Sequence, residues 1–180
     1  MRILNQESVA VLIDMQDRLF LHMHEKDLLL TNCLKLIDGL KILDIPVLVT
    51  QQYSIGLGPT VTPLIEKFTE FKYIEKNCFS CCDEPAFMDS LGQFKKPVTL
   101  LFGIESHVCI LQTCIDLLDK GLFPVVIEDC ISSRNVADKN IAIARMRQEG
   151  ARISSSESLL LELTRRAGNE RFKSISRIIK

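Results

Sequence analysis

Leu101-Phe-Gly-Ile-Glu-Ser-His-Val-Cys-Ile-Leu-Gln-Thr-Cys-Ile115 is the stretch that decides the fold, because an apolar run typical of a buried strand passes there into a helical pattern. One thiol, Cys109, falls in the first turn of the predicted helix. The unpaired N–H groups and the positive end of a helix dipole favour the thiolate form of a cysteine in that position. Cys109 is therefore our candidate nucleophile.

The strand-then-helix order continues on both sides of this stretch. Apolar runs predict buried strands at residues 9–13, 47–50, 97–102 and 123–127, with short strands at 71–74 and 151–154. Helical spacing predicts helices at 27–43, 64–68, 85–91, 107–118, 136–148 and 159–163, and a final amphipathic helix carrying Phe172, Ile175 and Ile179. We expect a polar connection at 129–135 and a capping box formed by Ser154 and Glu157. The alternation predicts an α/β fold, with a mostly parallel, doubly wound sheet between helices and a ligand site at the carboxyl ends of the strands.

The composition is typical of a compact globular protein. The 180 residues are 47% hydrophobic, and 22 basic residues against 23 acidic ones give a net charge of −1. We therefore expect a single domain over residues 1–180 that binds a small-molecule substrate, with no nucleic-acid or membrane partner. The seven cysteines are an odd number, and several lie in apolar patterns, so free thiols and a cytoplasmic location are predicted.

Two further polar residues could act together with Cys109. Asp14 ends the first predicted strand and should lie at the same sheet edge, and Lys76 falls on a loop or a strand end. A carboxylate can take the proton of a thiol, and a nearby ammonium can stabilise the thiolate. Each residue alone has an ordinary explanation, because aspartates often cap turns, most lysines are solvated and most cysteines are small buried hydrophobes. Only the three together indicate catalysis.

The remaining histidines and cysteines do not predict a metal site. The pairs His22-x-His24 and Cys78-x-x-Cys81 lack a second pair at a matching spacing. His107 lies two residues from Cys109, and side chains two apart on a helix face different directions, so it is interpreted as a rim or cap residue. No Gly-rich phosphate loop occurs, and we expect no cofactor and no metal.

Five motifs in order resemble the isochorismatase-like cysteine hydrolases, and within them the small isochorismatase domain-containing proteins. The motifs are Val11-Leu-Ile-Asp-Met-Gln-Asp17, Thr50-Gln-Gln-Tyr53 with Gly56-Leu-Gly-Pro-Thr60, Glu75-Lys-Asn-Cys-Phe-Ser80, Gly103-Ile-Glu-Ser-His-Val-Cys109 and Asp116-Leu-Leu-Asp-Lys-Gly121. The resemblance implies a three-layer α/β/α sandwich, a homo-oligomer, and an Asp-Lys-Cys triad that falls on Asp14, Lys76 and Cys109. Nicotinamidase-type members bind a metal through an Asp-x-His motif after the second strand. This chain has Gln51-Gln-Tyr-Ser there, so the resemblance implies no metal.

The resemblance also implies a non-proline cis peptide between Ile104 and Glu105. Backbone groups of that turn, including the one at Val108, would then bind an oxyanion. The residues expected to shape the substrate pocket are Gln16, Phe20, Gln52, Tyr53, Phe79 and His107.

Three functions are compatible with these residues. The first is metal-independent hydrolysis of a small amide or related acyl compound, with a thioester on Cys109, Asp14 as general acid and base, and Lys76 as the electrostatic partner. The second is a catalytically weak binding or scaffold protein that docks partners through the face of Phe172, Ile175 and Ile179. The third is a redox-sensing thiol at Cys109, which predicts rapid alkylation at neutral pH.

Overall fold

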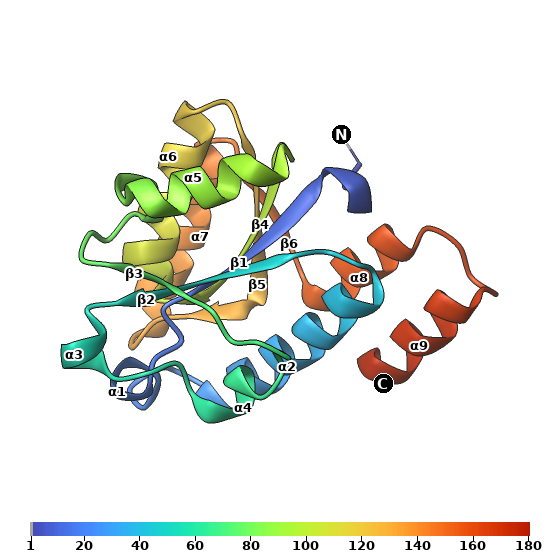
Figure 1. Ribbon diagram of the computed structural model, residues 1–180, viewed down its shortest axis with the longest axis horizontal. Helices are drawn as coiled ribbons and strands as arrows, with labels where there is room; N and C mark the ends of the chain where they lie inside the picture. Colours follow the sequence, from blue (N-terminus) through green and yellow to red (C-terminus); the bar gives the residue numbers. More distant parts are fainter. Residues whose placement is uncertain (1) are drawn as a thin grey trace.

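The computed structural model describes residues 2–180 and contains, within that range, one six-stranded sheet with helices on both faces (Figure 1). Neighbouring strands all pair in parallel, in the order β3-β2-β1-β4-β5-β6. The strands are β1 (Ser8–Ile13), β2 (Val47–Gln52), β3 (Ile74–Lys76), β4 (Val98–Ile104), β5 (Phe123–Ser132) and β6 (Arg152–Ser154). The predicted α/β fold with a parallel sheet is confirmed.

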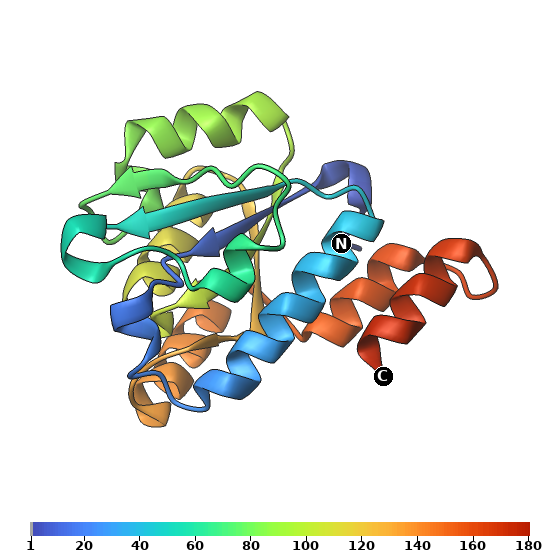
Figure 2. The same cartoon turned by 60° about the horizontal axis from the view of Figure 1, so that its bottom comes forward.

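The sheet is the middle of three layers (Figures 1 and 2). One outer layer consists of α2 (Lys26–Ile42), α8 (Ser156–Thr164) and α9 (Glu170–Ile179), and the other of α5 (Pro85–Phe94), α6 (Leu111–Asp119) and α7 (Val136–Gln148). Ala10 and Leu12 of β1 belong to the core on the α2 side, whereas Val9 and Val11 belong to the core on the α6 side. Because both faces of the central strands are covered, their sequences are uniformly apolar.

The functional end of the sheet is set by the order of its strands. The chain runs from β1 outward through β2 to β3 and then crosses back to form β4 on the other side of β1. Asp14 directly follows β1, and a π-helical turn at Ser106–Ile110 directly follows β4. Both segments therefore lie at the switch point of the sheet, where parallel α/β folds bind ligands.

Gly103 allows β4 to approach β1 at this end. Its φ is +122°, a conformation that side chains rarely adopt. A Cβ atom at this position would overlap the backbone carbonyl oxygen of Ile13. The glycine therefore holds the two strand ends that precede Asp14 and the π-helical turn close together.

Three local predictions are wrong. The strand expected at 71–74 lies instead at Ile74–Lys76, where it pairs with the end of β2. The polar connection expected at 129–135 is largely strand, because a register shift between Leu101 and Gly103 lets β5 continue to Ser132. The N-cap of α8 is Ser155, whose hydroxyl accepts from the N–H of Ser158, and not Ser154, because Ser154 still belongs to β6.

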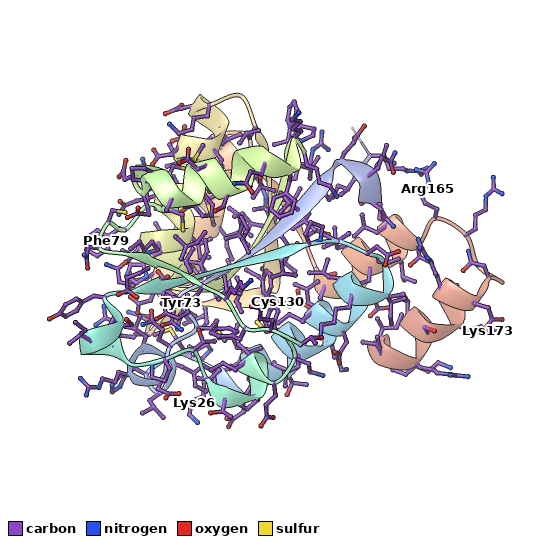
Figure 3. The ribbon with its side chains drawn as sticks, in the orientation of Figure 1. Lys26, Tyr73, Phe79, Cys130, Arg165 and Lys173 are labelled. Atoms are coloured by element: carbon purple, nitrogen blue, oxygen red, sulfur yellow. The ribbon has the colours of Figure 1, made fainter. Side chains whose placement is uncertain are left out.

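The last helix packs inside this chain. Ile175 of α9 is completely buried in the core on the α2 side, and Phe172 and Ile179 are half-buried. The polar face of α9 points outward, as Lys173 shows in Figure 3. The apolar face that we expected a scaffold partner to bind is therefore already used by α2 and α8.

Candidate active site

Asp14 is a buried carboxylate held at the end of β1. Its backbone is left-handed, with φ of 52°, a conformation that Asp tolerates better than most residues. One oxygen, Oδ1, accepts a hydrogen bond of 2.7 Å from the hydroxyl of Thr50 on β2. The other, Oδ2, accepts one of 2.6 Å from Nζ of Lys76. Four lone pairs on a carboxylate leave room for a further proton or donor.

Lys76 lies at the end of β3, with its side chain fully shielded from solvent. Besides Asp14, its ammonium donates to Oε1 of Gln52 at 2.7 Å and to the carbonyl oxygens of Cys78 and Phe79 at 3.1 and 3.3 Å. Burial lowers the pKa of Lys76, but the negative charges nearby, led by that of Asp14, outweigh burial, and the pKa is raised. Lys76 therefore stays charged at neutral pH.

Cys109 lies in the π-helical turn Ser106–Ile110, ahead of α6. Its Sγ is 3.7 Å from Nζ of Lys76 and 3.8 Å from Oε1 of Gln52. The residue is 6% exposed, so the thiol is nearly buried but opens onto a pocket. The structure thus brings together Asp14, Lys76 and Cys109, which lie at or after the ends of three different strands.

The expected thiolate character of Cys109 is not found. Burial raises the pKa of this thiol well above its ordinary value, and the charge of Asp14 raises it further, while Lys76 acts in the opposite direction. Desolvation therefore outweighs the effect of the helix start, and the thiol is protonated at neutral pH. Such a thiol needs a base before it can attack, and it lacks the low pKa of a redox sensor.

The turn before Cys109 contains the cis peptide that was predicted between Ile104 and Glu105. The backbone N–H of Val108 donates to the carbonyl oxygen of Glu105 at 3.2 Å. This donor is used inside the turn, so the geometry does not support Val108 as an oxyanion donor. Glu105 itself is nearly buried and forms part of the pocket wall.

The pocket in front of Cys109 has a volume of about 200 Å³. Its lining is mainly apolar and consists of Leu19, Gln52, Tyr53, Leu57, Phe79, Glu105, Val108 and Cys109. Tyr53 and Phe79 are about half exposed and stand at its mouth, and Figure 3 shows Phe79 at the edge of the molecule. Leu19 and Leu57 were not predicted, because apolar residues in short helices carry no signal that separates a pocket wall from a core.

Three of the predicted pocket residues lie outside this lining. Gln16 is buried, and its amide accepts from the N–H of Gln52 and donates to the carbonyl oxygens of Gln52 and Gly58, so it positions Gln52. Phe20 is part of the core on the α2 side. His107 is absent from the lining, and its Nδ1 lies 2.9 Å from the hydroxyl of Ser133.

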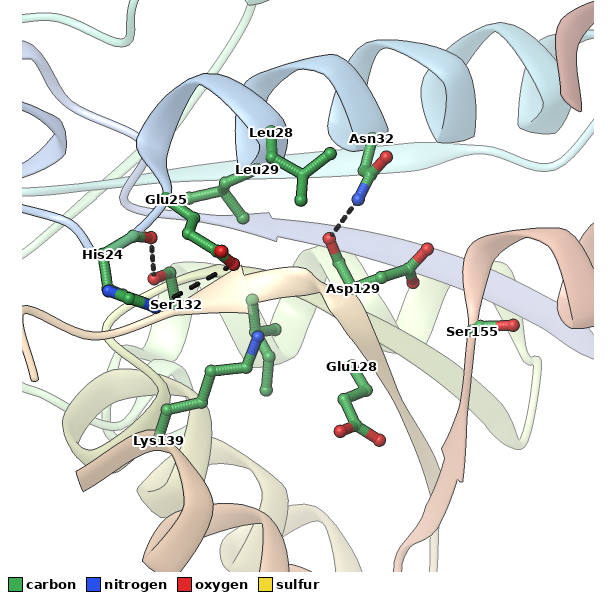
Figure 4. Close-up of a pocket in the computed structure, with 11 residues that line it drawn as sticks. His24, Glu25, Leu28, Leu29, Asn32, Glu128, Asp129, Ser132, Lys139 and Ser155 are labelled. Carbon is green, nitrogen blue, oxygen red and sulfur yellow. Dashed lines mark hydrogen bonds and ion pairs between the residues drawn. The ribbon is translucent and has the colours of Figure 1, made fainter. Parts of the chain in front are cut away.

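A second pocket of about 280 Å³ lies between α2 and the end of β5 (Figure 4). Side chains of both charges line it, among them Glu25, Glu128 and Lys139. Several of its polar groups are already bonded to each other, as between Asn32 and the carbonyl of Asp129. It contains none of the three candidate catalytic residues, so we place the chemistry in the smaller pocket.

No three His, Cys, Asp or Glu side chains among residues 2–180 converge as a metal ion requires. At the end of β2, where metal-binding members of the resembled family carry Asp-x-His, the side-chain amides of Gln51 and Gln52 form hydrogen bonds within the chain. Gln51 donates to the hydroxyl of Thr60 at 3.0 Å, and Gln52 accepts from Lys76.

Comparison with known proteins assigns the chain to a family. The family model of the isochorismatase domain matches residues 8–158, a span that contains Asp14, Lys76 and Cys109. The chain belongs to the isochorismatase family. Membership supports a hydrolase, and it agrees with the resemblance seen in the sequence motifs.

Similar isochorismatase-family proteins carry different names. The chain is 39% identical over 180 residues to isochorismatase domain-containing protein 2A of Mus musculus, covering 99% of this chain and 85% of the relative. It is 42% identical over 151 residues to a secreted isochorismatase effector of Phytophthora sojae, covering 81% and 71%. A solved structure described as MAR1 ribonuclease from Caenorhabditis elegans superposes with a TM-score of 0.92 at 37% identity, covering 99% and 92%. These names do not agree on one substrate.

Within residues 2–180 of this isochorismatase-family chain, every helix is too short or too polar to cross a membrane.

Proposed function

We propose that this protein is a metal-independent cysteine hydrolase that acts on a small amide or related acyl compound. The observation that carries the proposal is the position of Lys76 Nζ, 2.6 Å from Oδ2 of Asp14 and 3.7 Å from Sγ of Cys109, where Cys109 lines an apolar pocket. A base, a fixed positive charge and a nucleophile are thus within reach of one substrate atom.

The proposed reaction has two halves. Asp14 takes the proton of the Cys109 thiol, sulfur forms a bond to the carbonyl carbon, and the carbonyl electrons move onto oxygen. Collapse of this intermediate expels the amine, which receives its proton from Asp14, and leaves a thioester. Asp14 then deprotonates water, which attacks the thioester and releases the carboxylic acid and the thiol. The raised pKa of Cys109 supports this order, because the thiol must pass its proton to a base first.

Mass spectrometry of intact protein mixed with candidate amides tests the proposal. The wild type should gain the mass of an acyl group, and Cys109→Ala should not. Cys114→Ala is the matched control, since Cys114 is a buried thiol on α6 outside the pocket lining, and it should still form the adduct. Equal amide turnover by wild type and Cys109→Ala would contradict the proposal that Cys109 is the nucleophile.

A binding or scaffold role is the competing proposal, and it would have to use a surface other than the packed face of α9. The name of the worm relative suggests RNA as another substrate, but an apolar pocket with a carboxylate in its wall favours it less. A cytoplasmic location and a homo-oligomer stay predictions from the sequence. Sedimentation velocity at several concentrations tests the second, and a monomer at every concentration would contradict it.

A further inference from the structure

The pocket in front of Cys109 has an unusual charge pattern. Of the side chains that line it, within residues 2–180, Glu105 alone carries a formal charge at neutral pH. Its side chain is only 8% exposed, so water screens it little on the pocket side. The ammonium of Lys76 is nearby, but its charge is matched by Asp14 at 2.6 Å.

The charged and ring partners of Glu105 are residues that do not line the pocket. Nε of Arg134 donates to Oε1 at 2.8 Å, a second guanidinium nitrogen lies 3.5 Å from Oε2, and Nε2 of His107 is 3.9 Å from Oε2. The Arg134 side chain is 64% exposed and is absent from the pocket lining. Water screens the charge of this exposed guanidinium, so a ligand in the pocket faces the Glu105 carboxylate more directly than the guanidinium.

The size and the walls of the pocket limit the ligand further. Leu19, Leu57, Val108 and the rings of Tyr53 and Phe79 offer apolar surface. An apolar cavity of about 150 Å³ can hold benzene, so a volume of about 200 Å³ admits a group of that size and a few more atoms. A ligand that carries a carboxylate would have to bury this charge beside Glu105, which costs free energy. No basic residue among positions 2–180 lines the pocket to offset that cost.

We propose that the site takes uncharged amides whose acyl group is apolar and about as large as a benzene ring, and that Glu105 excludes anions. This inference rests on the proposed hydrolase function for the reaction, but the charge preference itself is a property of the pocket. Isochorismate carries two carboxylates and RNA a phosphate at every nucleotide, so both belong to the excluded class. Glu105 thus acts as a specificity-determining residue.

Alkylation of Cys109 measures the charge preference without any turnover. Iodoacetamide and iodoacetate have nearly the same shape and differ in charge. The rate of labelling at Cys109, followed by peptide mass spectrometry, is taken for each reagent in the folded protein and divided by the rate in the urea-unfolded protein. We expect the folded protein to prefer iodoacetamide by at least about tenfold after this correction.

Variants assign the preference to Glu105. Glu105→Gln should reduce the preference for iodoacetamide several-fold. Arg134→Gln should increase this preference, because the Glu105 carboxylate then loses its compensating charge. Glu66→Gln removes an exposed carboxylate that follows the short helix Thr62–Ile65 and does not line the pocket, and it should leave the preference for iodoacetamide unchanged. Circular dichroism confirms that each variant is folded. Equal corrected rates for both reagents, the same preference in Glu105→Gln, or no labelling by either reagent would overturn the proposal.

A matched pair of amides tests the substrate class. Isocaproamide and succinamate have the same branched shape, with two methyl groups replacing the carboxylate oxygens. We expect hydrolysis of isocaproamide to exceed that of succinamate by at least about tenfold in kcat/KM, and Glu105→Gln to narrow the ratio. Faster hydrolysis of succinamate would overturn the inference that anions are excluded, but the proposed hydrolase function would stand. If neither amide, nor any other, is hydrolysed while the alkylation preference persists, the amide assignment and the proposed function fail, but the anion exclusion stands.

Discussion

The ammonium of Lys76 lies 2.6 Å from Oδ2 of Asp14, and neither side chain has any exposed surface. Removing one member of a buried pair leaves the other charge without compensation. We expect Lys76→Met to lower the free energy of unfolding by about 3–5 kcal/mol in a urea titration. The double variant Lys76→Met with Asp14→Asn should lose less free energy of unfolding than the sum of the two single variants, because no uncompensated buried charge is left.

An exposed pair provides the comparison for that experiment. Lys173 and Glu170 on α9 are 2.6 Å apart but largely solvated. Lys173→Met should change the free energy of unfolding by only about 0–1 kcal/mol. Similar losses for both lysine variants would mean that the Asp14–Lys76 pair does not stabilise the folded state.

Alkaline pH should destabilise the protein through its buried thiols. Burial raises the pKa of Cys81, Cys82 and Cys114 from 9.0 to about 12. Between these values the folded chain keeps the protons and the unfolded chain loses them, so stability is full below about pH 9 and falls above it. Above about pH 9, each thiol lowers the free energy of unfolding by up to about 1.4 kcal/mol for each pH unit.

Urea midpoints measured between about pH 7 and pH 10 test this prediction. Cys114→Ala should show a shallower decline above about pH 9 than the wild type, whatever its stability at neutral pH. A midpoint that stays constant up to about pH 10 would contradict the raised pKa values.

The rate at which Cys109 is alkylated should also depend on its raised pKa and should increase with pH. Because burial and then Asp14 raise its pKa, the thiolate fraction at neutral pH is small. Labelling by iodoacetamide at Cys109 should become about ten times faster with each pH unit and should not level off below about pH 10. A plateau near neutral pH would instead support the redox-sensor function, and Cys109→Ala identifies the labelled site.

Gly103→Ala should weaken the contact between β1 and β4. The new methyl group would overlap the Ile13 carbonyl, at a φ of +122°. We expect a loss of about 3 kcal/mol in the free energy of unfolding, with reduced alkylation of Cys109 because the turn after β4 moves. Gly92→Ala is the control: nothing lies within 4 Å of its added methyl group, and in the last turn of α5 it should stabilise by up to about 1 kcal/mol.

Much of this architecture could be predicted from the sequence, because it depends on local patterns. Uniform apolar runs such as Val9–Ile13 mark strands that are covered on both faces, and helical spacing located α7 at Val136–Gln148. Strand ends meet at one edge in a parallel sheet, so Asp14 and Cys109 could be placed at a common site. Lys76, on a loop or a strand end, could be named as their partner from its charge, and the family motifs gave the same three residues. The prediction was weaker at 75–82, where the pattern has no clear period, and at β3, which is only three residues long.

Only the tertiary structure decided what surrounds these groups. Burial raises the pKa of Cys109, against the expectation from its position at a helix start, because desolvation depends on how many atoms pack around the sulfur from distant parts of the chain. The same applies to Glu105, which became a pocket wall, and to Ile175, which became core. The sequence by itself determined the order of elements and the identity of the reactive groups, since these follow from local periodicity and residue chemistry. Solvent access, pocket shape and charge balance came from the packing of segments between about twenty and sixty residues apart.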